Sequence, residues 1–101
     1  MQVKVFGQNV EVTDAISSHV QDRFSSALDR HSQVDEVIVR LEDLNGPKGG
    51  IDMRCQATIH LRRGEPIILE GVEADLYAAI SSVANRAKEV VSRHVEKRRG
   101  R

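Results

Sequence analysis

Histidine and cysteine are the residues of this chain best suited to bind a metal or attack a substrate. The four histidines are His19, His31, His60 and His94, and the single cysteine is Cys55. No two histidines share a metal-ligand spacing with the cysteine or a carboxylate on one predicted element, which disfavours a zinc site. Cys55 falls on the apolar side of an alternating pattern, where a thiol behaves as a small hydrophobic group. We therefore expect no metal, no cofactor and no nucleophilic catalysis.

The segment 45–50, Asn-Gly-Pro-Lys-Gly-Gly, is a second candidate for chemistry, because glycine-rich loops can hold phosphate groups. It lacks the G-x-x-x-x-G-K-S/T spacing of a phosphate loop, and it joins two predicted strands without a following helix. We therefore expect an ordinary strand connection here. Since no two polar residues make a convincing acid/base or nucleophile pair, an enzyme with a small-molecule substrate is the least favoured class of function.

The formal net charge is zero, but the charges are unevenly distributed along the chain. Residues 1–53 contain five basic and nine acidic side chains, 54–85 contain three and four, and 86–101 contain seven and two. The C-terminal segment therefore carries a charge of +5, which is typical of a surface that binds a polyanion. A solvated basic tail is the alternative interpretation.

The spacing of apolar residues predicts strands and helices that must position these charges. Alternation predicts strands at residues 2–6, 37–41, 51–61 and 67–70, and turn residues separate the later ones. Steps of three and four residues predict amphipathic helices at 14–30 and from 75 to about 98, with Thr13 as an N-cap. The 51–61 strand has the clearest pattern, with one apolar and one polar face.

The predicted order, β-α-β-β-β-α, belongs to the α+β class. We expect a two-layer sandwich with a four-stranded mixed sheet and both helices on one face. The first helix should join two parallel strands, and the remaining strands should form an antiparallel meander. A single domain at 1–98 and a basic tail at 99–101 are predicted. No signal peptide or membrane span is evident, so the expected location is cytoplasmic.

Basic residues lie in lines along both predicted helices. At 100° per residue, Arg86, Arg93 and Lys97 share one flank of the last helix, and Lys88 and Arg99 share the opposite flank. His19, Arg23 and Arg30 form a line on the first helix. If this line faces the Arg86 line, the two would border a cationic strip. Arginines that cover the edge of a core, with Glu89 neutralising Arg86 and Arg93, are the alternative.

Aromatic residues make up only 3% of the chain, which argues against a surface on which single bases stack. Any nucleic acid that binds should therefore be a duplex or be contacted through its backbone.

Several segments also resemble a known family. They are Thr13-Asp14-Ala15-Ile16, Val20 to Phe24, Ala57-Thr58-Ile59-His60 and, above all, Asp75-Leu76-Tyr77-Ala78-Ala79-Ile80 followed by a basic helix. Together with the element order, these segments are similar to the short ribosome hibernation promoting factors, also called ribosome-associated inhibitor A or protein Y relatives. The family was once labelled sigma-fifty-four modulation proteins. The resemblance covers nearly the whole chain.

The resemblance implies a fold related to double-stranded RNA-binding domains and a non-enzymatic role in silencing idle ribosomes during stress or stationary phase. The expected partner is the rRNA of the small ribosomal subunit, in the channel normally occupied by mRNA and tRNA, with the free protein a monomer. The candidate RNA-binding residues are Arg23, Arg30, Arg86, Lys88, Arg93, Lys97, Arg98 and Arg99. The alternative is a related domain that binds another RNA duplex or a protein partner.

Overall fold

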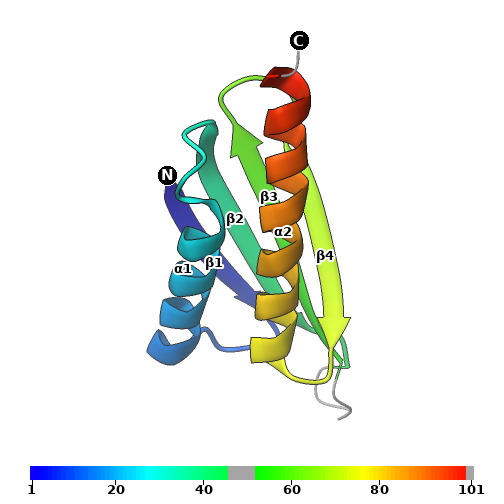
Figure 1. Cartoon of the computed structure of the whole chain (residues 1–101). Helices are drawn as coiled ribbons and strands as arrows, with labels where there is room; N and C mark the ends of the chain where they lie inside the picture. The colour runs from blue at the N-terminus through cyan, green and yellow to red at the C-terminus, as the bar shows by residue number, and fades with distance from the viewer. Residues whose placement is uncertain (46–51, 100–101) are drawn as a thin grey trace.

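The computed structural model describes residues 1–45 and 52–99, which form the predicted β-α-β-β-β-α order (Figure 1). The elements are β1 (Gln2–Gln8), α1 (Asp14–Leu28), β2 (Val34–Asp43), β3 (Met53–Leu61), β4 (Ile67–Glu73) and α2 (Leu76–Arg99). The predicted loop at 46–50, Ile51 of the third predicted strand and residues 100–101 of the predicted tail lie outside the described residues.

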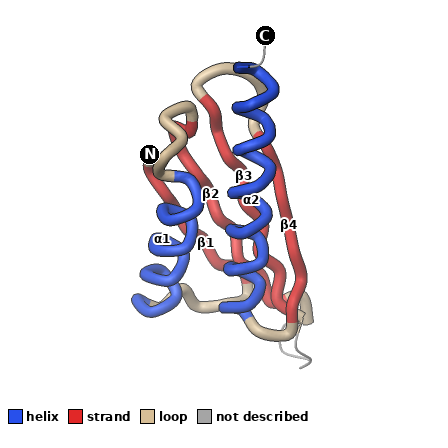
Figure 2. Tube along the Cα trace, viewed as in Figure 1, coloured by secondary structure: helices blue, strands red, loops and turns tan. Residues whose placement is uncertain are grey.

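The strands form one mixed sheet in the order β1-β2-β3-β4. β1 runs parallel to β2, with Val3 paired to Val37, and the pairs β2–β3 and β3–β4 are antiparallel. Both helices cover the same face of the sheet (Figure 2). α1 packs mainly over β1 and β2, and α2 packs over β3 and β4. The predicted α+β sandwich is confirmed, and its relation to double-stranded RNA-binding domains stays a prediction.

The core lies between the sheet and the two helices. Alternate residues of the central strands are fully buried, among them Val39 on β2 and Ile59 on β3. Phe24 on α1 and Ile80 on α2 fill the space above them. The apolar stripes predicted from periodicity therefore face inward, because only this packing removes both stripes and one sheet face from water.

α1 begins as predicted and ends two residues earlier than predicted. The side chain of Thr13 accepts a hydrogen bond from the backbone N–H of Ile16 at 3.2 Å, which satisfies a free donor of the first turn. At the other end, the N–H of His31 donates to the carbonyl of Leu28 at 2.9 Å, a tighter turn that ends the helix. Arg30 consequently lies in the turn after α1.

Three strands are longer than the alternation of apolar residues predicts, because backbone pairing continues where the pattern fades. β1 extends to Gln8 opposite Glu42, and β4 extends to Glu73 opposite Met53. Gly71 interrupts the apolar pattern of β4, but it allows α2 to approach closely. A Cβ atom added at Gly71 would lie 3.1 Å from Cγ2 of Val83.

Candidate nucleic-acid interface

Polar contacts join the two helical segments along their length. They link His19 to Ser81 at 3.2 Å, Arg23 to Asn85 at 3.3 Å, and His31, just after α1, to Ser92 at 3.2 Å. All three partners on α2 lie on one flank, at steps of four and seven residues. This flank of α2 therefore faces α1.

A groove of about 640 Å³ opens beside these contacts. Its lining residues are Arg30, Asn85, Lys88, Glu89, Ser92 and Arg93. Three of the six are cations, and Glu89 is the single carboxylate among them. A concave surface lined by charges of mainly one sign concentrates the electrostatic potential, so the groove favours an anionic ligand.

Glu89 neutralises only part of this charge. One of its carboxylate oxygens lies 3.4 Å from Nη2 of Arg93, one helical turn along α2. The two side chains are 73% and 75% exposed, so water screens the ion pair and little free energy is needed to break it. Within the ranges 1–45 and 52–96, neither Arg30 nor Lys88 forms an ion pair.

Arg23 sits over the helix pair with spare hydrogen-bonding capacity. Its Nη2 donates to Oδ1 of Asn85, while its Nε is buried and has no hydrogen-bond partner among the described residues. A guanidinium presents five N–H donors in a fixed plane, and this plane matches phosphate oxygens well. Arg23 is thus held at the helix pair, and because its Nε is buried, a phosphate there would have to meet its Nη groups.

The position of Arg86 corrects one prediction. The sequence predicts a cationic strip only if the Arg86 line faces the Arg23 line. Nη1 of Arg86 instead donates to the backbone carbonyl of Glu70 on β4, at 2.6 Å, while Arg93 of the same line reaches the groove. Lys88, placed by sequence on the opposite flank, lies in the groove near α1. The helical period defines two flanks, but the sheet order decides which flank faces α1 and which faces β4.

The remaining predicted cations, Lys97, Arg98 and Arg99, lie in the last turns of α2. Described side chains end at Glu96, so only the backbone of these three residues is placed.

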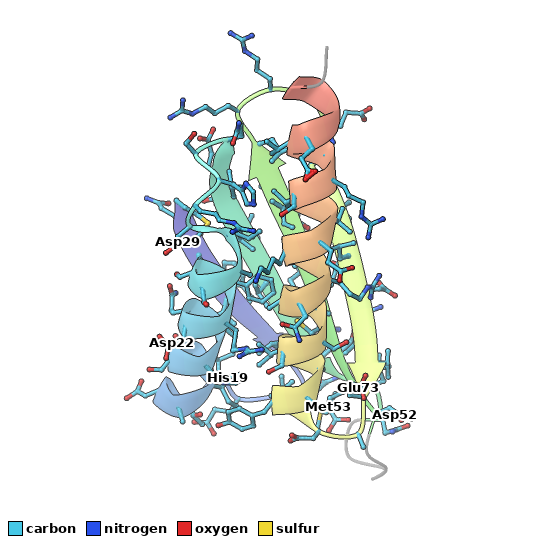
Figure 3. The ribbon with its side chains drawn as sticks, viewed as in Figure 1. His19, Asp22, Asp29, Asp52, Met53 and Glu73 are labelled. Carbon is cyan, nitrogen blue, oxygen red and sulfur yellow. The ribbon has the colours of Figure 1, made fainter. Side chains whose placement is uncertain are left out.

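Asp22 on α1 and Asp29 just after it lie away from the groove. In Figure 3, Asp22 and Asp29 project from the outer side of α1, whereas His19 lies on the side toward α2. The His19 ring also meets the Tyr77 ring edge to face, with centroids 4.9 Å apart. Asp22 and Asp29 therefore do not offset the cations of the groove, which leaves Glu89 as the acid nearest to them.

Sequence reasoning did not identify the uncharged polar residues that hold the two helices together. Ser81, Asn85 and Ser92 recur with Lys88 at steps of three and four residues on α2. That polar line beside the apolar stripe is a recognisable sign of a flank that faces a second polar surface. The small side chains of Asn85 and Ser92 leave space for the groove, and the long side chains of Arg30, Lys88 and Arg93 lie around it.

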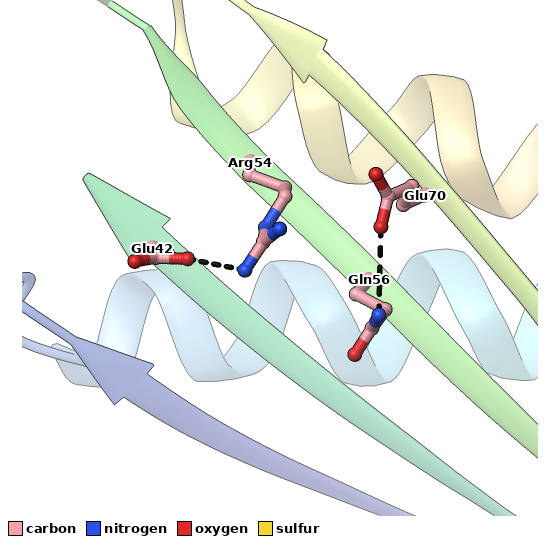
Figure 4. Close-up of polar contacts among 4 residues, drawn as sticks. All are labelled: Glu42, Arg54, Gln56 and Glu70. Atoms are coloured by element: carbon pink, nitrogen blue, oxygen red, sulfur yellow. Dashed lines mark hydrogen bonds and ion pairs between the residues drawn. The ribbon is translucent and has the colours of Figure 1, made fainter. Parts of the chain in front are cut away.

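The open face of the sheet presents a different arrangement. Lys4 pairs with Glu36 at 2.9 Å, and Arg54 pairs with Glu42 on the neighbouring strand (Figure 4). The amide of Gln56 donates to Glu70 at 3.4 Å. On this face most cations already have an acidic partner in the chain.

Three other features are relevant in the described parts of the chain: a metal site, a reactive thiol and a membrane-spanning helix. Among residues 1–45 and 52–99, no group of three or more His, Cys, Asp or Glu residues is placed to hold a metal ion. Burial raises the pKa of the Cys55 thiol to about 12, so it stays protonated at neutral pH. No helix in this part of the chain is long and apolar enough to cross a membrane.

The fold and the groove define a small two-layer α+β binding domain with a basic helical face. Residues 3–99 match the family model described as Sigma 54 modulation protein / S30EA ribosomal protein, and the chain belongs to this family. The resemblance seen in the sequence is thus confirmed.

Individual relatives agree with the family match. The ribosome hibernation promoting factor of Pseudomonas putida is 31% identical over 100 residues, which cover 96% of this chain and 89% of that protein. The chloroplast ribosome-binding factor PSRP1 of Spinacia oleracea is 37% identical over 82 residues, 78% of this chain but 27% of that longer protein. The crystal structure of the Thermus thermophilus Protein Y N-terminal domain is also similar, with 30% identity and a TM-score of 0.78. The alignment covers 93% of the present chain and 99% of the Thermus thermophilus chain.

Proposed function

We propose that this protein is a ribosome hibernation factor that binds small-subunit rRNA in the channel used by mRNA and tRNA. The family match and the relatives named as ribosome hibernation promoting factors support a ribosome-associated hibernation function and a ribosomal partner. The same family supports a binding protein and not an enzyme. The small-subunit rRNA and the channel are the finer part of the proposal.

The observation that carries the proposal is the groove between α2 and the turn after α1, where Arg30 and Lys88 have no carboxylate partner in the described structure and Arg93 has only a screened one. Each such cation gains binding free energy by neutralising a phosphate and releasing its counterions. rRNA presents phosphates at high density, so a groove with several cations fits its backbone.

The small number of exposed aromatic residues also favours contacts to the RNA backbone. Phe24 is fully buried, and Phe6 lies on the opposite, open face of the sheet, at 53% exposure. Tyr77, at the start of α2, is the one aromatic residue of this chain that the helical layer exposes, and its ring packs on His19. Binding should therefore read the shape and backbone of folded RNA instead of unstacked bases.

In this proposal the protein acts by occupying space. A domain held in the channel by phosphate contacts excludes mRNA and tRNA while it stays bound. No bond is made or broken, so activity depends on affinity alone. The expected setting is the cytoplasm of a cell under stress or in stationary phase.

Co-sedimentation tests the proposal. The protein should pellet with purified small subunits and not with large subunits, and saturating mRNA with tRNA should displace it. Equal retention by large subunits or by an unrelated RNA duplex would overturn the small-subunit site and favour a general duplex-binding domain. Failure to bind any ribosomal particle would leave the protein-partner alternative.

A further inference from the structure

The sheet has two edges, β1 and β4, and each edge strand carries backbone groups that no neighbouring strand uses. Such edges invite another strand to pair, which leads to self-association. Neither edge strand contains a proline, and β4 has the sequence Ile-Ile-Leu-Glu-Gly-Val-Glu, with one type of charge only. Lys4 on β1 and the glutamates of β4 are the charges that these strands themselves supply against pairing, and contacts from the helices add to them.

At the β4 edge, the long side chain of Arg86 reaches down from α2 to the strand. Its Nη1 donates to the backbone carbonyl oxygen of Glu70, in the middle of β4, at 2.6 Å. Gly71 helps this approach, because a Cβ atom there would lie 3.9 Å from the same Nη1 and 3.1 Å from Val83. The central acceptor of this edge is therefore already occupied.

At the β1 edge, α1 supplies an equivalent contact. Nε2 of Gln21 donates to the backbone carbonyl oxygen of Val3 at 2.7 Å. Each helix thus sends one long donor side chain to one carbonyl of the edge strand beside it. Gln21 lies on the flank of α1 that faces away from the groove, as Arg86 lies on the flank of α2 that faces away from it.

We propose that Gln21 and Arg86 guard the two sheet edges against strand addition by a second copy of this chain. A second strand at β4 would need the Glu70 carbonyl as an acceptor, and the guanidinium both occupies that oxygen and places a charge in the strand's path. Pairing would require the loss of a charged hydrogen bond, which opposes association.

The second copy is the occupant that β4 fits best, because the strand is self-complementary. Antiparallel pairing around a twofold axis at Glu70 places Ile68 of one copy opposite Val72 of the other. These side chains are 60% and 47% exposed on the open face, so pairing would remove apolar surface from water. The two Glu70 carboxylates would meet at the axis, and their repulsion adds a second barrier at neutral pH.

This proposal can be tested with variants in which the side chain keeps its length but loses its hydrogen-bond donor. Arg86→Met combined with Glu70→Gln should dimerise in sedimentation equilibrium from about 10 µM to about 1 mM, with association at least roughly tenfold stronger than that of wild type. Gln21→Met tests the other edge separately, and any association that it causes should slow hydrogen exchange on β1 and not on β4. Arg86→Lys with Glu70→Gln keeps a donor and should stay close to wild type.

Arg93→Met with Glu70→Gln is the matched control, because Arg93 is an exposed arginine of the same helix that contacts no edge strand. It should remain monomeric, and circular dichroism should show that every variant is folded. Hydrogen exchange should locate the contact, with slower exchange at the Glu70 amide as concentration rises. A monomeric Arg86→Met double variant, equal association of the Arg93→Met control, or protection of the Arg86→Met double variant away from β4 would each overturn the proposal.

Discussion

The two faces of this domain carry similar kinds of residues but differ in how their charges are partnered. On the open face, Lys4 and Arg54 are each paired with a glutamate of the neighbouring strand. On the helical face, Arg30 and Lys88 border a groove, with Glu89 the single acid in its lining. Partnering, more than the number of cations, distinguishes the face that is available to a polyanion.

The difference has a structural cause. In the sheet, residues on adjacent strands stand opposite one another in a fixed register, as Glu42 does with Arg54, so an acid and a base neutralise each other. Between the helices, the cations face serine and asparagine side chains, while Asp22 and Asp29 lie on the outer side of α1. On the open face, Lys4 and Arg54 are thus paired, while Arg40 forms no ion pair with the described residues. On the helical face, Arg30 and Lys88 are unpaired.

The largest expected effect comes from salt. If unpaired cations bind by neutralising phosphates, affinity for the small subunit should fall by roughly 10² to 10⁴ between about 50 and 200 mM monovalent salt. Binding titrations at four or more salt concentrations give the slope. Salt-independent binding would indicate a contact with a ribosomal protein. The unpaired cations of the helical face would then not explain binding.

Charge reversal on each face separates them directly. Arg30→Glu with Lys88→Glu should weaken small-subunit binding by roughly 100-fold and flatten the salt slope, because two phosphate contacts become repulsive. The matched reversal on the sheet, Lys4→Glu with Arg54→Glu, should weaken binding by less than about threefold. Both proteins must melt as wild type does for the ranking to count. The reverse ranking in folded proteins would move the RNA contact to the open face.

Removing the acid in the groove should strengthen RNA binding, whereas the charge reversals weaken it. Glu89→Gln frees Arg93 and raises the net charge of the groove by one, so affinity should increase by roughly two- to fivefold. Glu70→Gln, which removes one acid from the open face, is the control and should leave affinity unchanged. An unchanged affinity for Glu89→Gln would mean that Arg93 is not an RNA contact.

The smallest effect on binding should come from Cys55→Ala, because this residue is buried in the core. The change should lower the free energy of unfolding by about 1 kcal/mol and leave ribosome binding as it was. The wild-type thiol is protonated when folded but ionises near its ordinary pKa when unfolded.

This linkage gives a pH signature. Between the unfolded pKa of 9.0 and the folded value of about 12, the unfolded state binds fewer protons, so wild-type stability falls as pH rises. Below pH 9.0 this contribution is constant. Cys55→Ala should lack it, and denaturant melts of both proteins from pH 8 to about 11 measure the difference. Parallel stability curves would show that Cys55 is solvated.

Much of the fold could be predicted because its signals are local. The alternation of Cys55, Ala57 and Ile59 follows from a strand that buries one face, and the N-cap at Thr13 follows from the hydrogen bond that its side chain makes. Element ends were less predictable. β4 continues to Glu73 because β3 offers backbone partners there, which the side-chain pattern does not record.

The candidate site was predictable in residue type but not in arrangement. Periodicity placed Arg86 and Lys88 on opposite flanks of α2, yet only the sheet order shows that Lys88 faces the groove and Arg86 the β4 edge. The bond from Arg86 to a backbone carbonyl leaves no signal in sequence, because any residue can supply that acceptor. The RNA-binding roles of all eight predicted cations stay predictions.

The central claim is that the helical face meets the ribosome and the open sheet face does not, and two lysines of the unaltered protein report on it. Lys88 lines the groove, and Lys4 lies on the open face, where its side chain is 52% exposed. Lysine acetylation, read by mass spectrometry with and without small subunits, compares them in one sample. We predict strong protection of Lys88 on binding and unchanged modification of Lys4. Protection of Lys4 with continued modification of Lys88 would contradict this account.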